Sequence, residues 1–200
     1  MKSSRFTANF LFIFSVLILA SGCTSIRPVK IKQTLLPSGT LLPRHAVLVL
    51  DQALKDYKYE WKYGIGHTSV YPFGKALPDY AESVTSECFQ QVDVVSSVEE
   101  AISVTNANLI LIPRVVKCEH SMLPVWAWED IDFTFVVAWT AKDKTGQNTL
   151  WFKTITAESS EPLGDGFTMN RNELILEQKL FDDLSLKTFK AMQRAMELKN

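Results

Sequence analysis

The sequence predicts an α+β fold in which helices pack on one face of a mostly antiparallel sheet. Two observations support this prediction. Short apolar or alternating runs typical of strands recur along the chain, and several are joined by hairpin turn signals. Helical periodicity occurs in only three segments and does not follow every strand, as it would in a parallel α/β fold. The expected order of elements is β-β-β-α-β-α-β-β-β-α.

The first predicted strands lie between residues 46 and 71. Residues 46–50 (Ala-Val-Leu-Val-Leu) form a short apolar run, which is typical of a buried strand. Residues 57–63 alternate aromatic and charged side chains with a period of two. Residues 64–66 (Gly-Ile-Gly) predict a turn, after which residues 67–71 return as the hairpin partner.

Two helices follow in the central part of the chain. An apolar stripe at i, i+3, i+4, i+7 and i+11 runs from Leu77 to Cys88 and indicates an amphipathic helix. Ser96 or Ser97 is a suitable N-cap for the second, shorter helix, which has two glutamates in its first turn. These segments are a helix over 73–91, a strand over 92–95 and a helix over 97–104.

The C-terminal half predicts three strands and a long helix. Pro113 interrupts the first strand and indicates an edge position or a bulge. The helix carries apolar residues at helical spacing, with a break expected near residues 182–185. The predicted segments are strands over 108–118, 131–140 and 149–157, a hairpin turn over 142–146, and a helix over 172–199.

The amino terminus resembles a bacterial lipoprotein signal. Lys2 and Arg5 precede an apolar run from Phe10 to Ala20, and the sequence Leu-Ala-Ser-Gly-Cys ends at Cys23. Eleven helical residues extend only about 17 Å, which is too short to cross a bilayer core of about 30 Å. In such lipoproteins the peptide is cleaved before the cysteine, which then carries lipid. The alternative is an ordinary signal peptide in which Cys23 has no such role.

This resemblance implies a domain organisation and a location. We expect a signal peptide over 1–22, a lipidated Cys23 beginning a flexible, proline-bearing tether over 23–45, and one periplasmic α+β domain over 46–200. More than one acyl chain gives stable anchoring. Because Thr24 is not aspartate, the resemblance implies sorting to the outer membrane, with the domain facing the periplasm.

The net charge bears on nucleic-acid binding, and the number of cysteines bears on disulfide formation. Removing residues 1–22 with their two cations leaves 19 basic (21 − 2) and 22 acidic residues in 178 (200 − 22), a net charge near −3. No basic footprint for nucleic acid is present. If Cys23 carries lipid, Cys88 and Cys118 remain as an even pair in an oxidising compartment. They form either a disulfide or two buried thiols.

The residues from Phe73 to Val116 resemble a module of envelope lipoproteins. A helix ends in Cys-Phe-Gln-Gln-Val (88–92), and a small helix precedes the strand Ala-Asn-Leu-Ile-Leu-Ile-Pro (107–113). This order is similar to that in curli-secretion, penicillin-binding-protein-activator and exopolysaccharide-export lipoproteins and in the TolB amino-terminal domain. The resemblance implies an accessory or assembly factor without catalysis. Asn108 and the long aromatic hairpin depart from the pattern.

The sequence contains none of the common catalytic or metal-binding motifs. It has no G-x-S-x-G, H-E-x-x-H, C-x-x-C or phosphate-binding glycine loop. The histidines His45, His67 and His120 are expected in linker, hairpin and loop. We therefore predict no catalytic residue, no metal site and no cofactor.

The segment 121–128 is the strongest candidate for partner contact. Loops are normally polar, but this one carries five large apolar side chains, and tryptophan is favoured in binding hot spots. The alternative is that the loop folds over the sheet and is buried. The candidate contact residues are Met122, Leu123, Val125, Trp126 and Trp128.

Three functions from different classes remain, of which a periplasmic hydrolase ranks last. The first is a non-enzymatic outer-membrane lipoprotein that serves as an accessory or assembly factor in a cell-envelope complex and binds an envelope protein. The alternative is a periplasmic carrier of lipid or another apolar ligand, held between the helices and the sheet.

Overall fold

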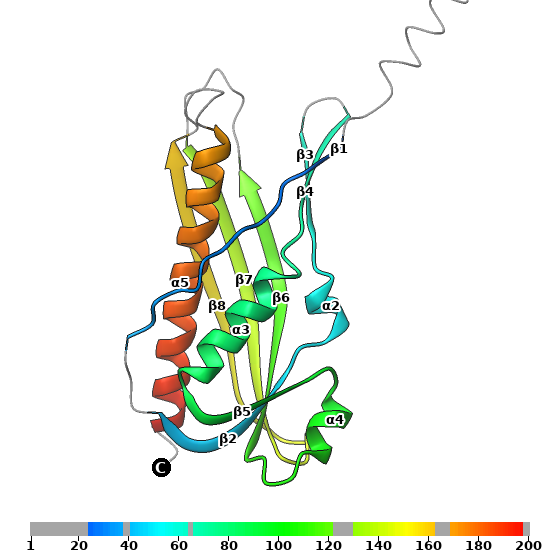
Figure 1. The fold of residues 1–200 in the computed structure, drawn as a ribbon, viewed down its shortest axis with the longest axis vertical. Coiled ribbons are helices and arrows are strands. Elements are labelled where there is room, and N and C mark those ends of the chain that lie inside the picture. Colours follow the sequence, from blue (N-terminus) through cyan, green and yellow to red (C-terminus); the bar gives the residue numbers. More distant parts are fainter. Residues whose placement is uncertain (1–23, 38–40, 64–65, 122–129, 163–168, 198–200) are drawn as a thin grey trace, which may run out of the picture. The chain divides into compact units, whose positions relative to one another are not determined.

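The computed structural model describes residues 24–37, 41–63, 66–121, 130–162 and 169–197 of the 200-residue chain (Figure 1). These residues form two compact units. The smaller unit combines the described residues up to Pro28 with Lys58–Pro72, and the larger unit combines Val29–Tyr57 with the chain from Phe73 onward.

The smaller unit is a three-stranded sheet. Its strand order is β1-β4-β3. The antiparallel hairpin of β3 and β4 confirms the predicted pairing, with Trp61 opposite Ser69. β1 pairs with β4 in parallel, and the sequence did not predict this strand. The strands are β1 (Thr24–Ile26), β3 (Tyr59–Tyr63) and β4 (His67–Tyr71).

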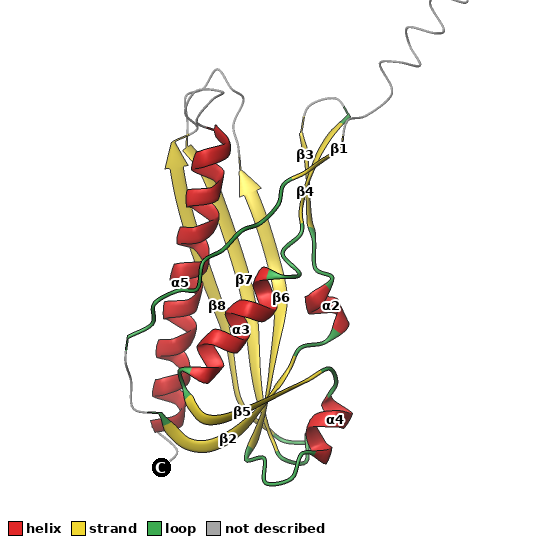
Figure 2. Cartoon of the chain, viewed as in Figure 1, coloured by secondary structure: helices red, strands yellow, loops and turns green. Residues whose placement is uncertain are grey.

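The larger unit contains a five-stranded mixed sheet in the order β5-β2-β6-β7-β8 (Figure 2). β5, β2 and β6 are parallel, whereas β6, β7 and β8 form an antiparallel meander. The sheet is therefore not purely antiparallel. The strands are β2 (Leu42–Val49), β5 (Phe89–Val95), β6 (Leu109–Ser121), β7 (Asp130–Asp143) and β8 (Thr149–Pro162).

The helices confirm the α+β class. The predicted break near residues 182–185 is absent, because α5 is one continuous helix. α3 ends before the predicted Gln91, since the carbonyl of Cys88 already accepts a hydrogen bond from the Leu42 N–H at 2.8 Å and the chain enters the sheet. The helices are α2 (Gln52–Lys55), α3 (Ala76–Ser86), α4 (Val98–Ser103) and α5 (Met169–Glu197).

The structure confirms two local predictions, one for the N-cap of α4 and one for the position of Pro113. The Ser97 side chain caps α4 by accepting from the Glu100 N–H at 3.2 Å. β2 pairs with β6 only from Leu109 to Leu111. Pro113 therefore lies beyond the part of β6 that pairs with β2, where a residue without an N–H is tolerated.

The two faces of the large sheet are covered by different helices. Side chains alternate between the faces of a strand, so the register assigns each residue to a side. Val47 and Ile110 are opposite each other and form a buried cluster with Ala101 of α4. Leu48 and Leu111 therefore point to the other face, where α3 and α5 lie. The short helix α4 differs in this way from the prediction that helices occupy one face.

The interface between the helices and the sheet is filled by aromatic rings. Phe73 lies 5.2 Å from Phe135 and 6.0 Å from Phe181 between ring centroids. All three rings are buried. Aromatic pairs at these separations stabilise a core beyond the area that they bury.

A buried hydrogen-bond network joins β7, α3 and α5. The Trp139 Nε1–H donates to the Tyr80 hydroxyl at 3.0 Å, and the Tyr80 and Thr188 hydroxyl oxygens lie 2.6 Å apart. Burial raises the pKa of Tyr80, so the phenol remains neutral and able to donate. The network fixes the positions of both long helices over the sheet.

We predict that Tyr80→Phe lowers the free energy of unfolding by about 1–3 kcal/mol, because it leaves two buried polar groups without their partner. Thr188→Val should lower the free energy of unfolding by about 1 kcal/mol. Because the residues share one network, the double variant should cost less than the sum of the single variants. Urea unfolding followed by circular dichroism measures these values. If the two single variants lower the free energy of unfolding by amounts that add up fully in the double variant, the network is contradicted.

Candidate functional site

The lipidation and loop residues predicted from the sequence lie outside the described residues. These are Cys23 and the contact candidates Met122, Leu123, Val125, Trp126 and Trp128. Their roles stay predictions. The structure does place the two ends of the loop, Ser121 on β6 and Asp130 on β7.

Of the two alternatives for Cys88 and Cys118, the disulfide is not formed. Cys88 and Cys118 are both free thiols. The strand register explains the separation. Cys88 immediately precedes β5, near Leu42, whereas Cys118 lies nine residues beyond Leu109, the partner of Ala46. With the four residues from Leu42 to Ala46, the offset is about 13 residues along the parallel strands, on the order of 40 Å at about 3.3 Å per residue. A disulfide requires Cα atoms within about 7 Å.

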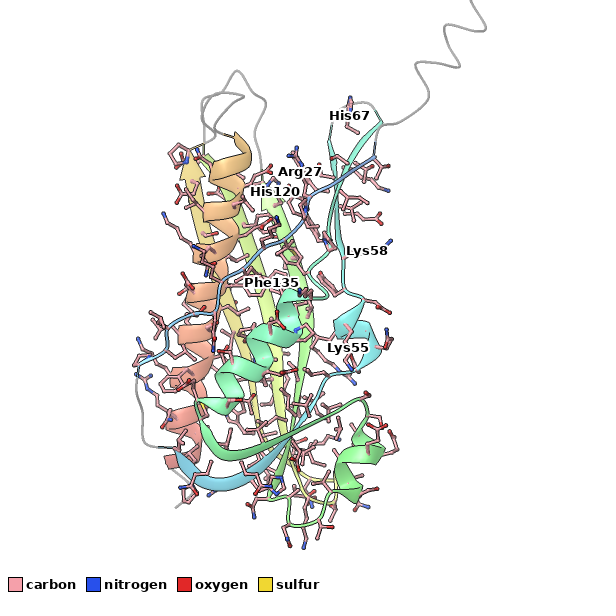
Figure 3. The ribbon with its side chains drawn as sticks, viewed as in Figure 1. Arg27, Lys55, Lys58, His67, His120 and Phe135 are labelled. Carbon is pink, nitrogen blue, oxygen red and sulfur yellow. The ribbon has the colours of Figure 1, made fainter. Side chains whose placement is uncertain are left out.

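The three histidines lie on three different strands, β2, β4 and β6. His45 is buried in β2, not in a linker, and its Nε2 lies 2.8 Å from Asp93 Oδ2 on the neighbouring β5. His120, which is labelled in Figure 3, is buried on β6. Its ring lies 4.7 Å from that of Phe133 on the neighbouring strand β7. His67 is exposed on β4 of the smaller unit. Among the described residues, no group of three or more His, Cys, Asp or Glu side chains is arranged to hold a metal.

The segment expected to be a flexible tether is attached to the folded chain. Thr24–Ile26 is strand β1, and β2 begins at Leu42. Between them, residues 29–37, here named the strap, run across α3 and α5 (Figure 1). The Gln178 side chain both accepts from the Lys32 N–H at 2.8 Å and donates to the Lys32 carbonyl at 3.1 Å. Any extended segment can form side-chain to backbone bonds of this kind, whatever its sequence. The pattern of apolar residues therefore gave no sign that the strap packs against α5.

A groove of about 600 Å³ lies between the strap, α3 and α5. Tyr80 and Phe181 contribute to its lining. Its charged residues have both signs, so the groove has no strong preference for one charge. They are Lys30, Lys32, Lys75, Asp79, Glu82 and Glu87.

A second groove, of about 700 Å³, lies between the outer edge of β8 and the C-terminal half of α5. Trp151, Ile155, Ala191 and Ala195 provide its apolar surface. The charged residues that line it are all cations, namely Lys153, Lys187, Lys190 and Arg194. We name this feature the β8–α5 groove.

Part of the β8 edge is closed by α5 side chains. Lys187 Nζ donates to the Thr156 carbonyl at 3.0 Å, and the Glu158 N–H donates to Asp183 Oδ2 at 3.4 Å. Further along, Lys179 pairs with Glu161. Charged side chains are a common way to protect an edge strand. The Lys187 bond to Thr156 lies at one end of the β8–α5 groove, and beyond it, at Thr154 and Phe152, the described edge has no such bond to α5.

The residues of the β8–α5 groove were not among the candidates predicted from the sequence. A signal was present, because Lys187, Lys190 and Arg194 recur at i, i+3 and i+7 and so share one helix face. Their relation to Lys153 depends on which strand packs against α5, and no pattern in the sequence specifies that.

The helices of the described residues are α2, α3, α4 and α5. None of these described helices combines the length and the apolar character needed to span a bilayer.

Comparison with known proteins supports the fold. No protein-family model matches the chain. No curated protein matches it either. A crystal structure of a DUF330 protein from Xanthomonas campestris superposes with a TM-score of 0.56 at 11% identity, covering 86% of this chain and 99% of that chain.

Two solved lipoproteins are less similar. A minor lipoprotein from Acinetobacter baumannii has a TM-score of 0.46 at 17% identity, covering 78% of this chain and 95% of its own. Lipoprotein B from Nitrosomonas europaea has a TM-score of 0.44 at 12% identity, covering 85% of this chain and 91% of its own. At such identities the comparison establishes that the chain shares its fold with the Xanthomonas protein.

We predict that Cys88 and Cys118 do not react with Ellman's reagent in the folded protein. Burial raises the pKa of Cys88 to about 12 and also raises that of Cys118, so little thiolate is present even at pH 9. In a Cys23→Ser chain, both thiols should react after unfolding in guanidinium chloride. Fast reaction of the native chain, or an intact mass lower by two hydrogens, would contradict the prediction.

Proposed function

We propose that the chain is a non-enzymatic lipoprotein of the bacterial outer membrane that acts as an accessory or assembly factor by binding another envelope protein. The amino-terminal sequence ending in Cys23 supports the anchor. The observation that supports the binding role best is the β8–α5 groove, in which one strand edge lies open beside a row of cations.

The geometry favours this function over a lipid carrier. A carrier of the kind expected from the sequence needs space between the helices and the sheet. In the described residues that interface is occupied by Phe73, Phe135, Phe181 and Trp139, all at 1% exposure or less. The groove under the strap has charges of both signs, which is a poor environment for an acyl chain.

We predict that Cys23→Ser releases the protein from the outer membrane into the soluble periplasmic fraction, because the variant has no thiol to carry lipid. Mass spectrometry of the amino-terminal peptide should show a diacylglycerol and an amide-linked acyl chain on Cys23 of the native protein. Cys118→Ser serves as the matched control and should stay in the membrane. A Cys23→Ser chain that fractionates with the outer membrane would contradict the anchor.

We also predict that the double variant Trp126→Ala, Trp128→Ala captures less envelope protein than the native chain. Chemical crosslinking in whole cells followed by affinity purification measures the loss, which should be about tenfold if the tryptophans contribute as hot spots. Exchange of the exposed Ile102→Ala on α4 provides a control outside the loop and outside the β8–α5 groove. Unchanged capture by the double variant would exclude the loop as the contact.

A further inference from the structure

The register of β8 defines which backbone groups face away from the sheet. In an antiparallel strand the N–H and C=O of each residue point to one side, and this side alternates along the chain. The bonds of Thr156 and Glu158 to α5 side chains show that these two residues point outward. Pairing with β7 is regular from Trp151 to Pro162. Phe152 and Thr154 therefore also direct their N–H and C=O groups outward.

The outward groups of Phe152 and Thr154 are available for a further strand. Among the residues that the structure describes, none donates to or accepts from them across the outer edge. The facing side of α5 has Ala191 and Ala195 at the groove. Small side chains at these positions leave room for another backbone beside β8.

The charged side chains around the outer edge of β8 determine which kind of segment can bind there. Lys153, Lys190 and Arg194 form no ion pair within the described chain, whereas Lys187 lies 2.6 Å from Asp183 Oδ2. No acidic side chain lines the groove. An entering segment that brings carboxylates gains complementary contacts, and a basic segment is repelled.

From this geometry we propose that the β8–α5 groove binds an extended acidic segment of a partner protein, which pairs with β8 as a sixth strand. Strand addition at an open sheet edge uses the main chain for affinity and side chains for specificity. The inference rests on the proposed function, in which the domain binds an envelope protein, and it names the chemistry of the segment bound.

Charge argues against a second copy as the occupant. A two-fold dimer through β8 would place the same surface on both sides of the interface. The cations Lys153, Lys190 and Arg194 of one copy would then approach those of the other. Edge cations discourage such self-pairing while leaving the edge open to an acidic strand.

The first test measures peptide binding by isothermal titration calorimetry with the full-length chain in detergent. The probe is a short capped peptide of alternating glutamate and valine, compared with its lysine–valine counterpart. The acidic peptide should bind at least about tenfold more tightly. Lys190→Glu with Arg194→Glu should weaken it about tenfold, whereas Lys30→Glu with Lys32→Glu on the strap should change binding less than about twofold.

The second test addresses the backbone bonds. Thr154→Pro removes an outward N–H and no bond to β7, so it should abolish binding of the acidic peptide, whereas Thr154→Ala should bind like the native chain. Hydrogen exchange provides a measurement that needs no variant. Addition of the acidic peptide should slow exchange of the Phe152 and Thr154 amides, and a peptide with proline in place of its central valine should not.

Several results would overturn the inference. Equal binding of the acidic and basic peptides, or exchange at Phe152 and Thr154 that the acidic peptide does not slow, would exclude strand addition. A dimer in sedimentation that Thr154→Pro dissociates would identify a second copy as the occupant. Binding to phosphatidylglycerol vesicles in place of the peptide, lost on charge reversal, would identify a lipid surface.

The same variants separate this inference from the proposed function. If Cys23 is lipidated and Thr154→Pro captures envelope proteins as well as Thr154→Ala does, the proposed function stands and the groove inference fails. If the peptide binds as expected but Cys23 carries no lipid, the anchor in the proposed function fails and the groove inference stands.

Discussion

The contact of Phe181 on α5 with Phe73 and Phe135 is the interaction on which the larger unit depends. β6, β7 and β8 present one apolar face, and an antiparallel sheet of this kind needs a cover on that side. α5 supplies most of this cover. The contacts among the three rings set the distance between the helix and the strands. Trp139 and Tyr80 then fix its position along the sheet through directional hydrogen bonds.

Once α5 is fixed in this way, its other faces acquire roles that its own sequence does not reveal. One side holds the strap through Gln178. Another side places Asp183 and Lys187 against the edge of β8 and closes part of it. The last turns have alanines and cations instead, and there the edge stays open. A single helix thus covers the core, holds the amino-terminal segment and forms one wall of the candidate binding site.

The local predictions from the sequence were confirmed where the cause is local. The hairpin of β3 and β4 follows from alternation and a glycine turn, and the Ser97 cap follows from its side-chain oxygen. The predictions that were wrong concern contacts distant in sequence. The disulfide alternative for Cys88 and Cys118 rested on their even number, yet the parallel order of β5, β2 and β6 places the two thiols far apart.

The sequence by itself determined the α+β class, most strands, the long helices and the lipoprotein-like amino terminus, because each depends on residues that are neighbours in the chain. Only the tertiary structure decided that three strands are parallel, that α4 covers the opposite face and that residues 29–37 are docked. It also brought Lys153 beside Arg194. These features arise from packing between distant segments, where many pairings satisfy the same hydrophobic pattern and only the complete core selects one.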